Sequence, residues 1–152
     1  MAHHHHDPGT ACLTADARAV LEAAGERWTT LRAATHAILS RAERPVSAYD
    51  LAEALSRDEG RRVAANSVYR ILDLFVRANL ARRIETANAY LANTHPACEH
   101  DCVWLICEEC GVVEHRDDDA AVAGVLAVAG GGGFVATRPV LEVLGRCEAC
   151  AG

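Results

Sequence analysis

The 152-residue chain contains no lysine, few aromatic residues and no long apolar run. All fifteen basic residues are therefore arginines, and because aromatics make up only 5% of the sequence, a packed core must be built mainly from Ala, Leu and Val. No stretch of 18 apolar residues and no apolar N-terminal segment occur, so neither a transmembrane helix nor a signal peptide is predicted. The length suits one average domain or two small ones.

Charge is unevenly distributed along the chain. Residues 1–92 contain 12 Arg and 11 acidic residues, a net charge of +1, whereas residues 93–152 contain 3 Arg and 10 acidic residues, a net charge of −7. An anionic ligand is therefore expected on the first part and a cation on the second. The asymmetry is modest, so charge alone does not establish nucleic-acid binding.

Cysteine is abundant, and four of the seven cysteines form two C-x-x-C pairs, Cys107–Cys110 and Cys147–Cys150, separated by 36 residues. Two such turns supply the four soft thiolates of a closed tetrahedral site, for which zinc is the natural metal. Two disulfides or four unbound thiols are the alternative, which the lack of an export signal disfavours because the cytoplasm is reducing. A four-thiolate site has no vacant position for a substrate, so we expect a structural role.

Periodicity in the first part predicts helices followed by a hairpin. The predicted helices run from Asp16 to Ala24, from Thr29 or Thr30 to a break at Pro45, from Ser47 to about residue 55, and from Ala65 to Ala78. The charged stretch 56–63 is predicted to be a loop, and residues 80–85 and 89–91 two short strands. Three helices followed by a hairpin are typical of a winged helix-turn-helix, whose last helix enters the major groove of DNA.

The start of the last of these helices carries side chains suited to DNA. Arg70 near a helix N-terminus can donate two hydrogen bonds to guanine, and the neighbouring polar side chains can hold phosphates or contact thymine methyl groups. These neighbours are Asn66, Ser67 and Tyr69. An exposed amphipathic helix with an ordinary surface arginine is the alternative interpretation.

The second part reads as a small α/β domain. A tail at 1–13, a winged-helix domain at 14–92 and a linker at 93–102 precede it, so the predicted fold class is α+β. Its predicted elements are strands at 103–107 and 112–116, a helix at 120–129 capped by Asp117–Asp119 and ended by Gly130–Gly133, and strands at 134–137 and 140–144. Because so small a domain has little core, a zinc site would stabilise it substantially.

Five runs of sequence resemble the ferric uptake regulator family. They are Arg27–Arg32 (RWTTLR), Val46–Leu51 (VSAYDL), Ser67–Leu72 (SVYRIL), Leu105–Gly111 (LICEECG) and Gly145–Cys150 (GRCEAC). They occur in the family's order, and the resemblance extends over nearly all of residues 14–150. The resemblance implies a dimeric, metal-activated repressor with an N-terminal winged-helix domain and a C-terminal dimerisation domain. It also implies that Tyr69 and Arg70 contact DNA and that Tyr49 lies close to it.

The resemblance also bears on which metal is sensed. Iron-type members carry histidines and an Asp just before the first ribbon cysteine, where this chain has Cys102–Ile106. They carry a Glu after the aromatic residue of the wing, where Leu91 follows Tyr90. What remains is a softer set of ligands that favours zinc over iron or manganese, namely His95, Cys98, His100 and Cys102.

Within the family, the zinc uptake regulator branch places a His seven residues before the first ribbon cysteine and a ligand five residues after the second. These positions are His100 and His115 here. The branch also carries a His in the first wing strand and a Cys near the end of the wing, where this chain has Arg82 and Asn93. We therefore predict that Cys98 or His95 supplies the missing ligands, with Cys102 a weaker candidate. The predicted regulatory set is His95, Cys98, His100 and His115.

These observations predict a zinc-responsive transcriptional repressor that binds operator DNA as a homodimer in the cytoplasm and controls zinc uptake genes. One structural and at least one regulatory zinc are expected per protomer, with no enzymatic activity and no small-molecule substrate. An iron-, manganese- or peroxide-sensing regulator is the alternative within the family. A zinc-buffering protein, or a zinc hydrolase using His95, His100 and His115, is more distant, because the sequence contains no Glu-containing zinc-protease motif.

Three further features have open interpretations. The histidines His3–His6 are either the remnant of an affinity tag or a native metal-binding tail. Cys12 is either a free thiol or a partner of that tail. His36 lies within a predicted helix and is expected to be packed or exposed rather than to bind metal.

Overall fold

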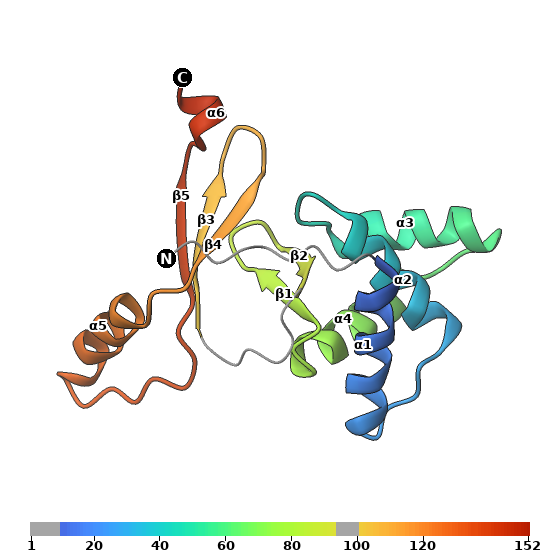
Figure 1. The fold of residues 1–152 in the computed structure, drawn as a ribbon, viewed down its shortest axis with the longest axis horizontal. Helices are drawn as coiled ribbons and strands as arrows, with labels where there is room; N and C mark the ends of the chain where they lie inside the picture. The colour runs from blue at the N-terminus through green and yellow to red at the C-terminus, as the bar shows by residue number, and fades with distance from the viewer. Residues whose placement is uncertain (1–9, 94–100) are drawn as a thin grey trace. The chain divides into compact units, whose positions relative to one another are not determined.

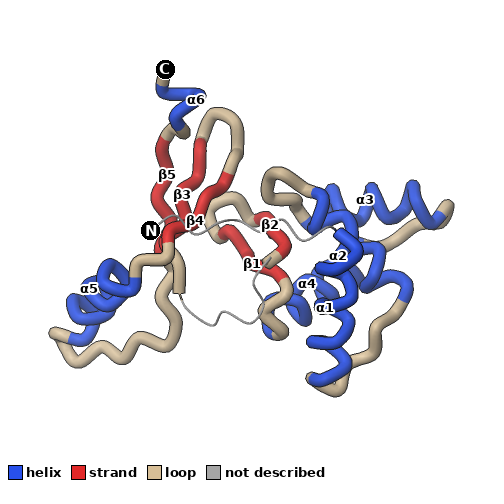
Figure 2. Tube along the Cα trace, viewed as in Figure 1, coloured by secondary structure: helices blue, strands red, loops and turns tan. Residues whose placement is uncertain are grey.

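The computed structural model describes residues 10–93 and 101–152, with side chains from Asp16 onward in the first segment. The chain divides into two compact units, Met1–Ala42 with Val46–Ala97, and Glu43–Pro45 with Cys98–Gly152. Helices dominate the first unit and a sheet is the centre of the second (Figure 1, Figure 2). Most of the predicted tail and linker lie outside the described residues, so the domain boundaries at 13, 92 and 102 stay predictions.

The first unit contains four helices, α1 (Thr10–Ala23), α2 (Thr30–Arg41), α3 (Ala48–Glu59) and α4 (Ala65–Arg77). Thr29 caps α2 by accepting a hydrogen bond from the backbone of Arg32, as its sequence position predicts. Two predicted boundaries were wrong. Helix α1 begins at Thr10 rather than Asp16, and α3 continues through the charged stretch to Glu59, because Gly60, with φ of +63°, provides its left-handed end.

A two-stranded hairpin follows α4 and forms the wing. Strand β1 (Ala81–Ile84) pairs antiparallel with β2 (Ala89–Ala92). The turn between them ends at Asn88, whose φ of +46° suits an asparagine. Val46 and Tyr90 exchange two backbone hydrogen bonds of 2.9 Å, which attach the wing to the segment between α2 and α3.

One apolar core holds these helices and the wing together. Helix α4 contributes most to it, since Val68, Leu72 and Phe75 are fully buried on one face of the helix. Val76 is only half-buried, whereas Leu74 is buried. Tyr90 of the wing is also buried and has an aromatic ring large enough to fill the space between wing and helices.

The second unit is built on a three-stranded sheet. Its elements are β3 (Val103–Cys107), β4 (Val113–Arg116), α5 (Asp119–Gly130), β5 (Leu141–Gly145) and α6 (Glu148–Ala151). The strand order is β4-β3-β5, with β4 antiparallel and β5 parallel to the central strand β3 (Figure 1). Asp118 caps α5 through the backbone N–H of Ala121. The strand predicted at 134–137 was wrong, since these residues are an exposed loop.

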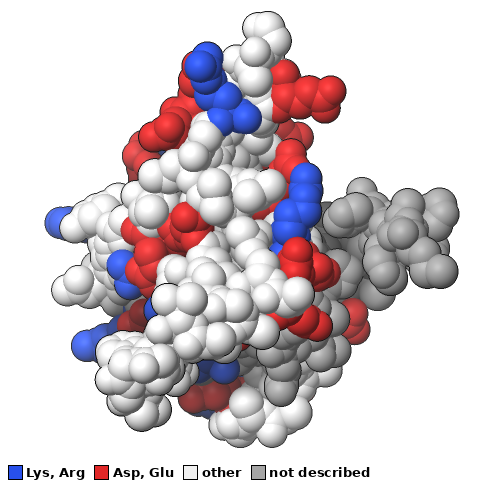
Figure 3. Space-filling model, turned by 90° about the vertical axis from the view of Figure 1, so that its left-hand side faces the viewer, with Lys and Arg blue, Asp and Glu red and all other residues white. Residues whose placement is uncertain are grey.

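The second unit buries little apolar surface within one chain. Among its described residues, only Ile106, Cys107 and Val122 are buried apolar side chains. Large apolar side chains are instead exposed along α5, the following loop and β5, namely Val125, Val128, Phe134, Val135, Val140, Val143 and Leu144. Figure 3, viewed from the side of α5, shows uncharged surface between acidic side chains. None of the described helices combines the length and apolar character that a bilayer crossing requires.

Candidate DNA-binding surface and metal centre

The first turn of α4 is open to an external ligand. Its N-cap residue, Ala64, makes no side-chain capping bond, so backbone N–H groups at the helix start remain available. Asn66, Ser67 and Arg70 are all exposed on the side away from the core. Free amides and the positive end of the helix dipole favour an anion such as a phosphate at this position.

Two tyrosines connect α3 to this turn. Tyr49 is 68% exposed in the first turn of α3, and its ring meets that of Tyr69 edge to face with a centroid separation of 6.2 Å. Ser47 fixes the start of α3, because its hydroxyl accepts from the backbone N–H of Asp50 at 3.1 Å and donates to the Asp50 carboxylate at 2.7 Å. All five residues predicted to face DNA therefore lie at the starts of α3 and α4.

Exposed arginines outside the predicted set lie in the loop before α4 and in the wing. Arg61 and Arg62 are exposed in the loop that leads into α4, where Arg61 lies 3.5 Å from the Glu59 carboxylate. In the wing, Arg83 contacts the Asn88 side chain at 3.0 Å and Glu85 at 3.1 Å. The paired Arg61-Arg62 is a signal that the sequence contained, although the acidic residues before it conceal its basic character.

The four C-x-x-C thiols come together in the second unit. The sulfur atoms of Cys107, Cys110, Cys147 and Cys150 all lie within 4.8 Å of one another. Cys107 ends β3 and Cys147 is the N-cap of α6, while a 2.8 Å backbone bond from Glu108 to Gly145 keeps the two turns adjacent. The disulfide alternative was wrong, because all four thiols are free in this structure.

The spacing of these thiols suits zinc. The Cys110 and Cys147 sulfurs lie 3.7 Å apart. Sulfurs bound to one tetrahedral zinc at about 2.3 Å would lie about 3.8 Å apart, whereas a disulfide needs about 2.05 Å. The cluster can therefore hold a zinc ion with little rearrangement.

The local hydrogen bonds already favour removal of a proton from this cluster. Backbone N–H groups of Cys110 and Cys147, together with that of Glu109, lower the pKa of the Cys107 thiol to about 6. Hydrogen bonds in which the Cys150 thiol is the donor, to the sulfurs of Cys147 and Cys110, raise the pKa of Cys150 to about 12. Cys107 is therefore the thiol that loses its proton most readily, and the remaining thiols of the cluster must lose theirs when a metal binds.

Of the predicted regulatory ligands, the structure describes His115 alone. His95, Cys98 and His100 lie outside the described residues, as do His3–His6 and the side chain of Cys12. His115 lies on β4, 5.6 Å from the Trp104 ring between centroids, with Nε2 3.9 Å from Asp117 Oδ1. The Cys102 thiol donates to the same Asp117 oxygen at 3.2 Å.

Arg82 and Asn93 stand at the two wing positions where zinc uptake regulators carry metal ligands, and both make contacts within the first unit. Arg82 pairs with Leu91 across the wing. The Asn93 side chain donates to the backbone oxygen of Asn79 at 2.7 Å, and its backbone N–H donates to Leu80. Asn93 therefore stabilises the end of the wing.

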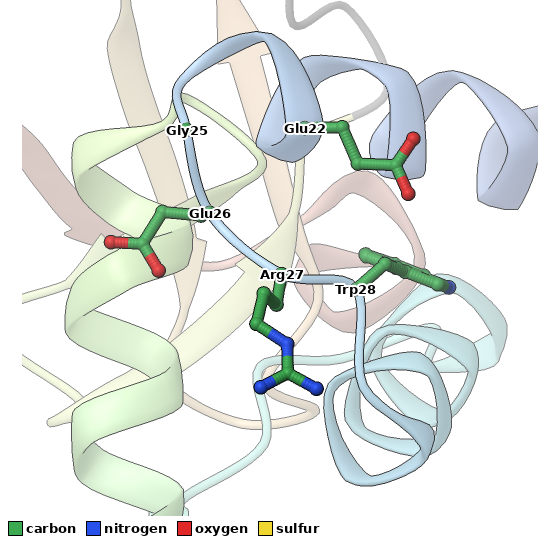
Figure 4. Close-up of a pocket in the computed structure, with 5 residues that line it drawn as sticks. All are labelled: Glu22, Gly25, Glu26, Arg27 and Trp28. Atoms are coloured by element: carbon green, nitrogen blue, oxygen red, sulfur yellow. The ribbon is translucent and has the colours of Figure 1, made fainter.

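A surface hollow of about 350 Å³ lies between the end of α1 and the start of α2. Glu22, Gly25, Glu26, Arg27 and Trp28 line it (Figure 4). The Glu26 carboxylate is paired with Arg32 at 3.1 Å. Mixed charges around an open hollow give no ligand chemistry comparable with that of the thiol cluster.

The family model of the ferric uptake regulators matches residues 23–135. The chain belongs to the ferric uptake regulator family. The match spans both units of this family member, so the resemblance seen in the sequence is confirmed, as is the predicted order of a winged helix-turn-helix and a small α/β domain.

Relatives of this family member include zinc uptake regulators. The zinc uptake regulation protein of Escherichia coli strain K12 is 27% identical over 139 residues, covering 91% of this chain and 81% of the relative. The structure of a zinc uptake regulator complexed with zinc and DNA has a TM-score of 0.87 at 26% identity, covering 95% of this chain and 97% of the other. Holo XcZur has a TM-score of 0.80 at 30% identity, covering 94% and 99%.

Proposed function

We propose that this protein is a zinc-responsive transcriptional repressor that binds operator DNA as a homodimer and controls zinc uptake genes in the cytoplasm. The observation that carries the proposal is the uncapped, exposed first turn of α4, where Asn66, Ser67 and Arg70 stand beside the Tyr49–Tyr69 pair. A relative whose structure was determined with zinc and DNA has the same fold over nearly its whole length. An enzymatic role is not proposed, because the family is one of regulators.

At the DNA, Arg70 would read a base in the major groove while its neighbours fix the helix on the backbone. A bidentate arginine–guanine contact contributes about 1–3 kcal/mol of discrimination. Asn66 and Ser67, next to the free amides of α4, would hold a phosphate, and the exposed ring of Tyr49 would contact the backbone or a thymine methyl group.

The exposed apolar surface of the second unit supports assembly with another copy of the chain. Its side chains lie on α5, the following loop and the sheet-edge strand β5, where Val143 and Leu144 are each about half exposed. Apolar surface and an unpaired strand edge are together unfavourable in water, and a second copy would cover both. A twofold dimer would present two α4 helices to successive major grooves.

Zinc would be held in two kinds of site. The closed cluster of Cys107, Cys110, Cys147 and Cys150 would hold one zinc permanently and stabilise a unit with little core. At least one more zinc per protomer would be bound by regulatory ligands from the predicted set of His95, Cys98, His100 and His115. Bound zinc supplies a rigid connection between ligands and no redox chemistry.

Regulation would follow from a shift in population. Ligands of the 93–102 linker and of β4 would be drawn together on zinc binding, which narrows the positions that the two winged helices of a dimer sample. Zinc can favour DNA binding only if it binds the DNA-competent arrangement more tightly, so DNA must tighten zinc binding equally. Couplings of about 1–3 kcal/mol, usual for such systems, correspond to about 5- to 150-fold in affinity.

The proposal is tested by fluorescence anisotropy with promoter DNA from upstream of the zinc transporter genes of the same genome. Zinc should raise affinity about 5- to 150-fold, and Arg70→Ala should remove a similar factor by deleting the base contact. Arg77→Ala is the matched control, because Arg77 is also exposed but lies in the last turn of α4. The proposal fails if zinc has no effect, if Fe²⁺ or Mn²⁺ activates in its place, or if Arg70→Ala binds like the wild type.

A further inference from the structure

Three side chains with different ligand atoms meet at the open end of the β3–β4 hairpin. Cys102 immediately precedes β3 and Asp117 immediately follows β4. Since Val103 pairs with Arg116 and Trp104 with His115, Cys102 lies opposite Asp117, on the face that also carries His115. Asp117 Oδ1 is 3.2 Å from Cys102 Sγ and 3.9 Å from His115 Nε2.

We propose that Cys102, His115 and Asp117 bind zinc as a second site on the hairpin, separate from the four-cysteine cluster. The inference rests on the proposed zinc-responsive function and assigns its regulatory ligands. It makes Cys102, rather than Cys98, the thiolate of the regulatory site, and it adds a carboxylate that the sequence did not suggest.

Two of the three ligand-atom separations are close to those of a zinc site. From usual zinc bond lengths of about 2.0–2.3 Å, tetrahedral ligand pairs lie about 3.5–3.7 Å apart for sulfur with oxygen and about 3.3–3.5 Å apart for nitrogen with oxygen. The observed 3.2 and 3.9 Å differ from these values by a few tenths of an ångström. Among the described residues, only the four-cysteine group has all its ligand atoms within 4.8 Å, so His115 must turn towards Cys102 to complete the hairpin site.

The surroundings favour metal binding at these three side chains. The ring of His115 packs against Trp104, and the exposed Asp117 carboxylate leaves the site open to solvent. Thiolate, imidazole and carboxylate together match the ligand preferences of zinc. Three protein ligands leave one position for water, and such a site should release zinc more readily than the closed cluster, as a sensor requires.

The location also gives binding a structural consequence. Cys102 is the last residue of the predicted 93–102 linker, and His115 and Asp117 belong to the opposite side of the hairpin. A metal held by all three would therefore fix the point at which the linker enters the second unit. The wing residues Arg82 and Asn93 need supply no ligand.

Cobalt substitution in the full-length protein tests the assignment. The protein is prepared with zinc retained in the four-cysteine cluster, and Co²⁺ is added to the labile site after mild chelation. A thiolate–cobalt charge-transfer band should appear in the wild type and in Cys98→Ser, but not in Cys102→Ser. Persistence of the band in Cys102→Ser overturns the inference.

A second variant keeps the test informative if Cys102→Ser folds poorly. Asp117→Asn should weaken zinc binding at the labile site at least tenfold, while Asp119→Asn, a nearby exposed residue in α5, should leave it unchanged. Equal zinc affinity for the two variants contradicts the site. If promoter binding responds to zinc but the Cys102→Ser band persists, the inference fails and the proposed function stands. If wild-type promoter binding ignores zinc, the proposed function itself fails.

Discussion

At the scale of single residues, His36 is a histidine packed in the interior of the first unit. The residue is 3% exposed, and its ring meets Trp28 and Phe75 at centroid distances of 5.9 Å, with Nδ1 3.3 Å from the Ser40 hydroxyl. Burial lowers the pKa of His36 below its ordinary value of 6.5. The sequence predicted packing or exposure rather than metal binding, and the structure shows packing.

The burial of His36 predicts a pH dependence of stability. Between the lowered pKa and 6.5 the unfolded chain binds a proton that the folded chain does not, so stability rises with pH across this window and falls as pH drops below 6.5. The limiting slope is about 1.4 kcal/mol per pH unit for one proton. Urea unfolding between pH 5.5 and 7.5 should show stability falling as the pH drops below 6.5 in the wild type and a smaller fall in His36→Leu. Parallel curves for the two proteins would contradict the assignment.

Residue-level chemistry was predictable where spacing alone determines it. The C-x-x-C pairs indicated their cluster because each turn brings two thiols together regardless of the rest of the fold. The contact between Cys102 and Asp117 was not predictable in this way, because it depends on the register that places Val103 opposite Arg116. A shift of one residue would move one of the two side chains to the other face of the hairpin.

At the scale of elements, capping residues determined the starts of α2 and α3. Ser47 and Thr29 were identified from sequence as N-caps, and the hydroxyl group of each accepts from the backbone N–H three residues onward. The predicted strand at 134–137 failed because a β-prone sequence becomes a strand only with a neighbour to pair with. Phe134 and Val135 are 68% and 82% exposed within one chain.

The cap at Ser47 and the exposed position of Ser67 predict that a serine-to-alanine substitution lowers stability at the first site and has little effect on stability at the second. Ser47→Ala removes two hydrogen bonds to Asp50 and should lower the free energy of unfolding by about 1 kcal/mol, equivalent to about 4–8 °C in melting temperature for a unit of this size. Ser67→Ala should alter stability by less than about 0.5 kcal/mol, because Ser67 is exposed and caps nothing.

For promoter affinity, Ser67→Ala is expected to be the more harmful of the two variants. Ser67→Ala should weaken promoter binding measured by anisotropy, since it removes a phosphate contact beside the α4 amides. Equal melting temperatures for Ser47→Ala and the wild type would show that the cap does not stabilise α3.

At the scale of the whole molecule, the two units have complementary chemistry. Residues 1–92 carry a net charge of +1 and the exposed α4 surface, while residues 93–152 carry a net charge of −7 and the thiol cluster. DNA and metal ions are thus attracted to different parts of one chain. The family and the two-unit order were predictable from motifs, whereas the exposed apolar face needed a structure, because α5 lacks an amphipathic pattern and its Ala and Val residues read as core.

The central claim is that a labile zinc, distinct from the structural one, controls DNA binding. The direct test measures zinc per protomer and promoter affinity in the same samples before and after mild chelation. One zinc per protomer should resist chelation, at least one should leave, and affinity should fall about 5- to 150-fold in parallel with the loss and return when zinc is restored. Unchanged promoter affinity after loss of the labile zinc, or a single class of zinc throughout, would contradict the account.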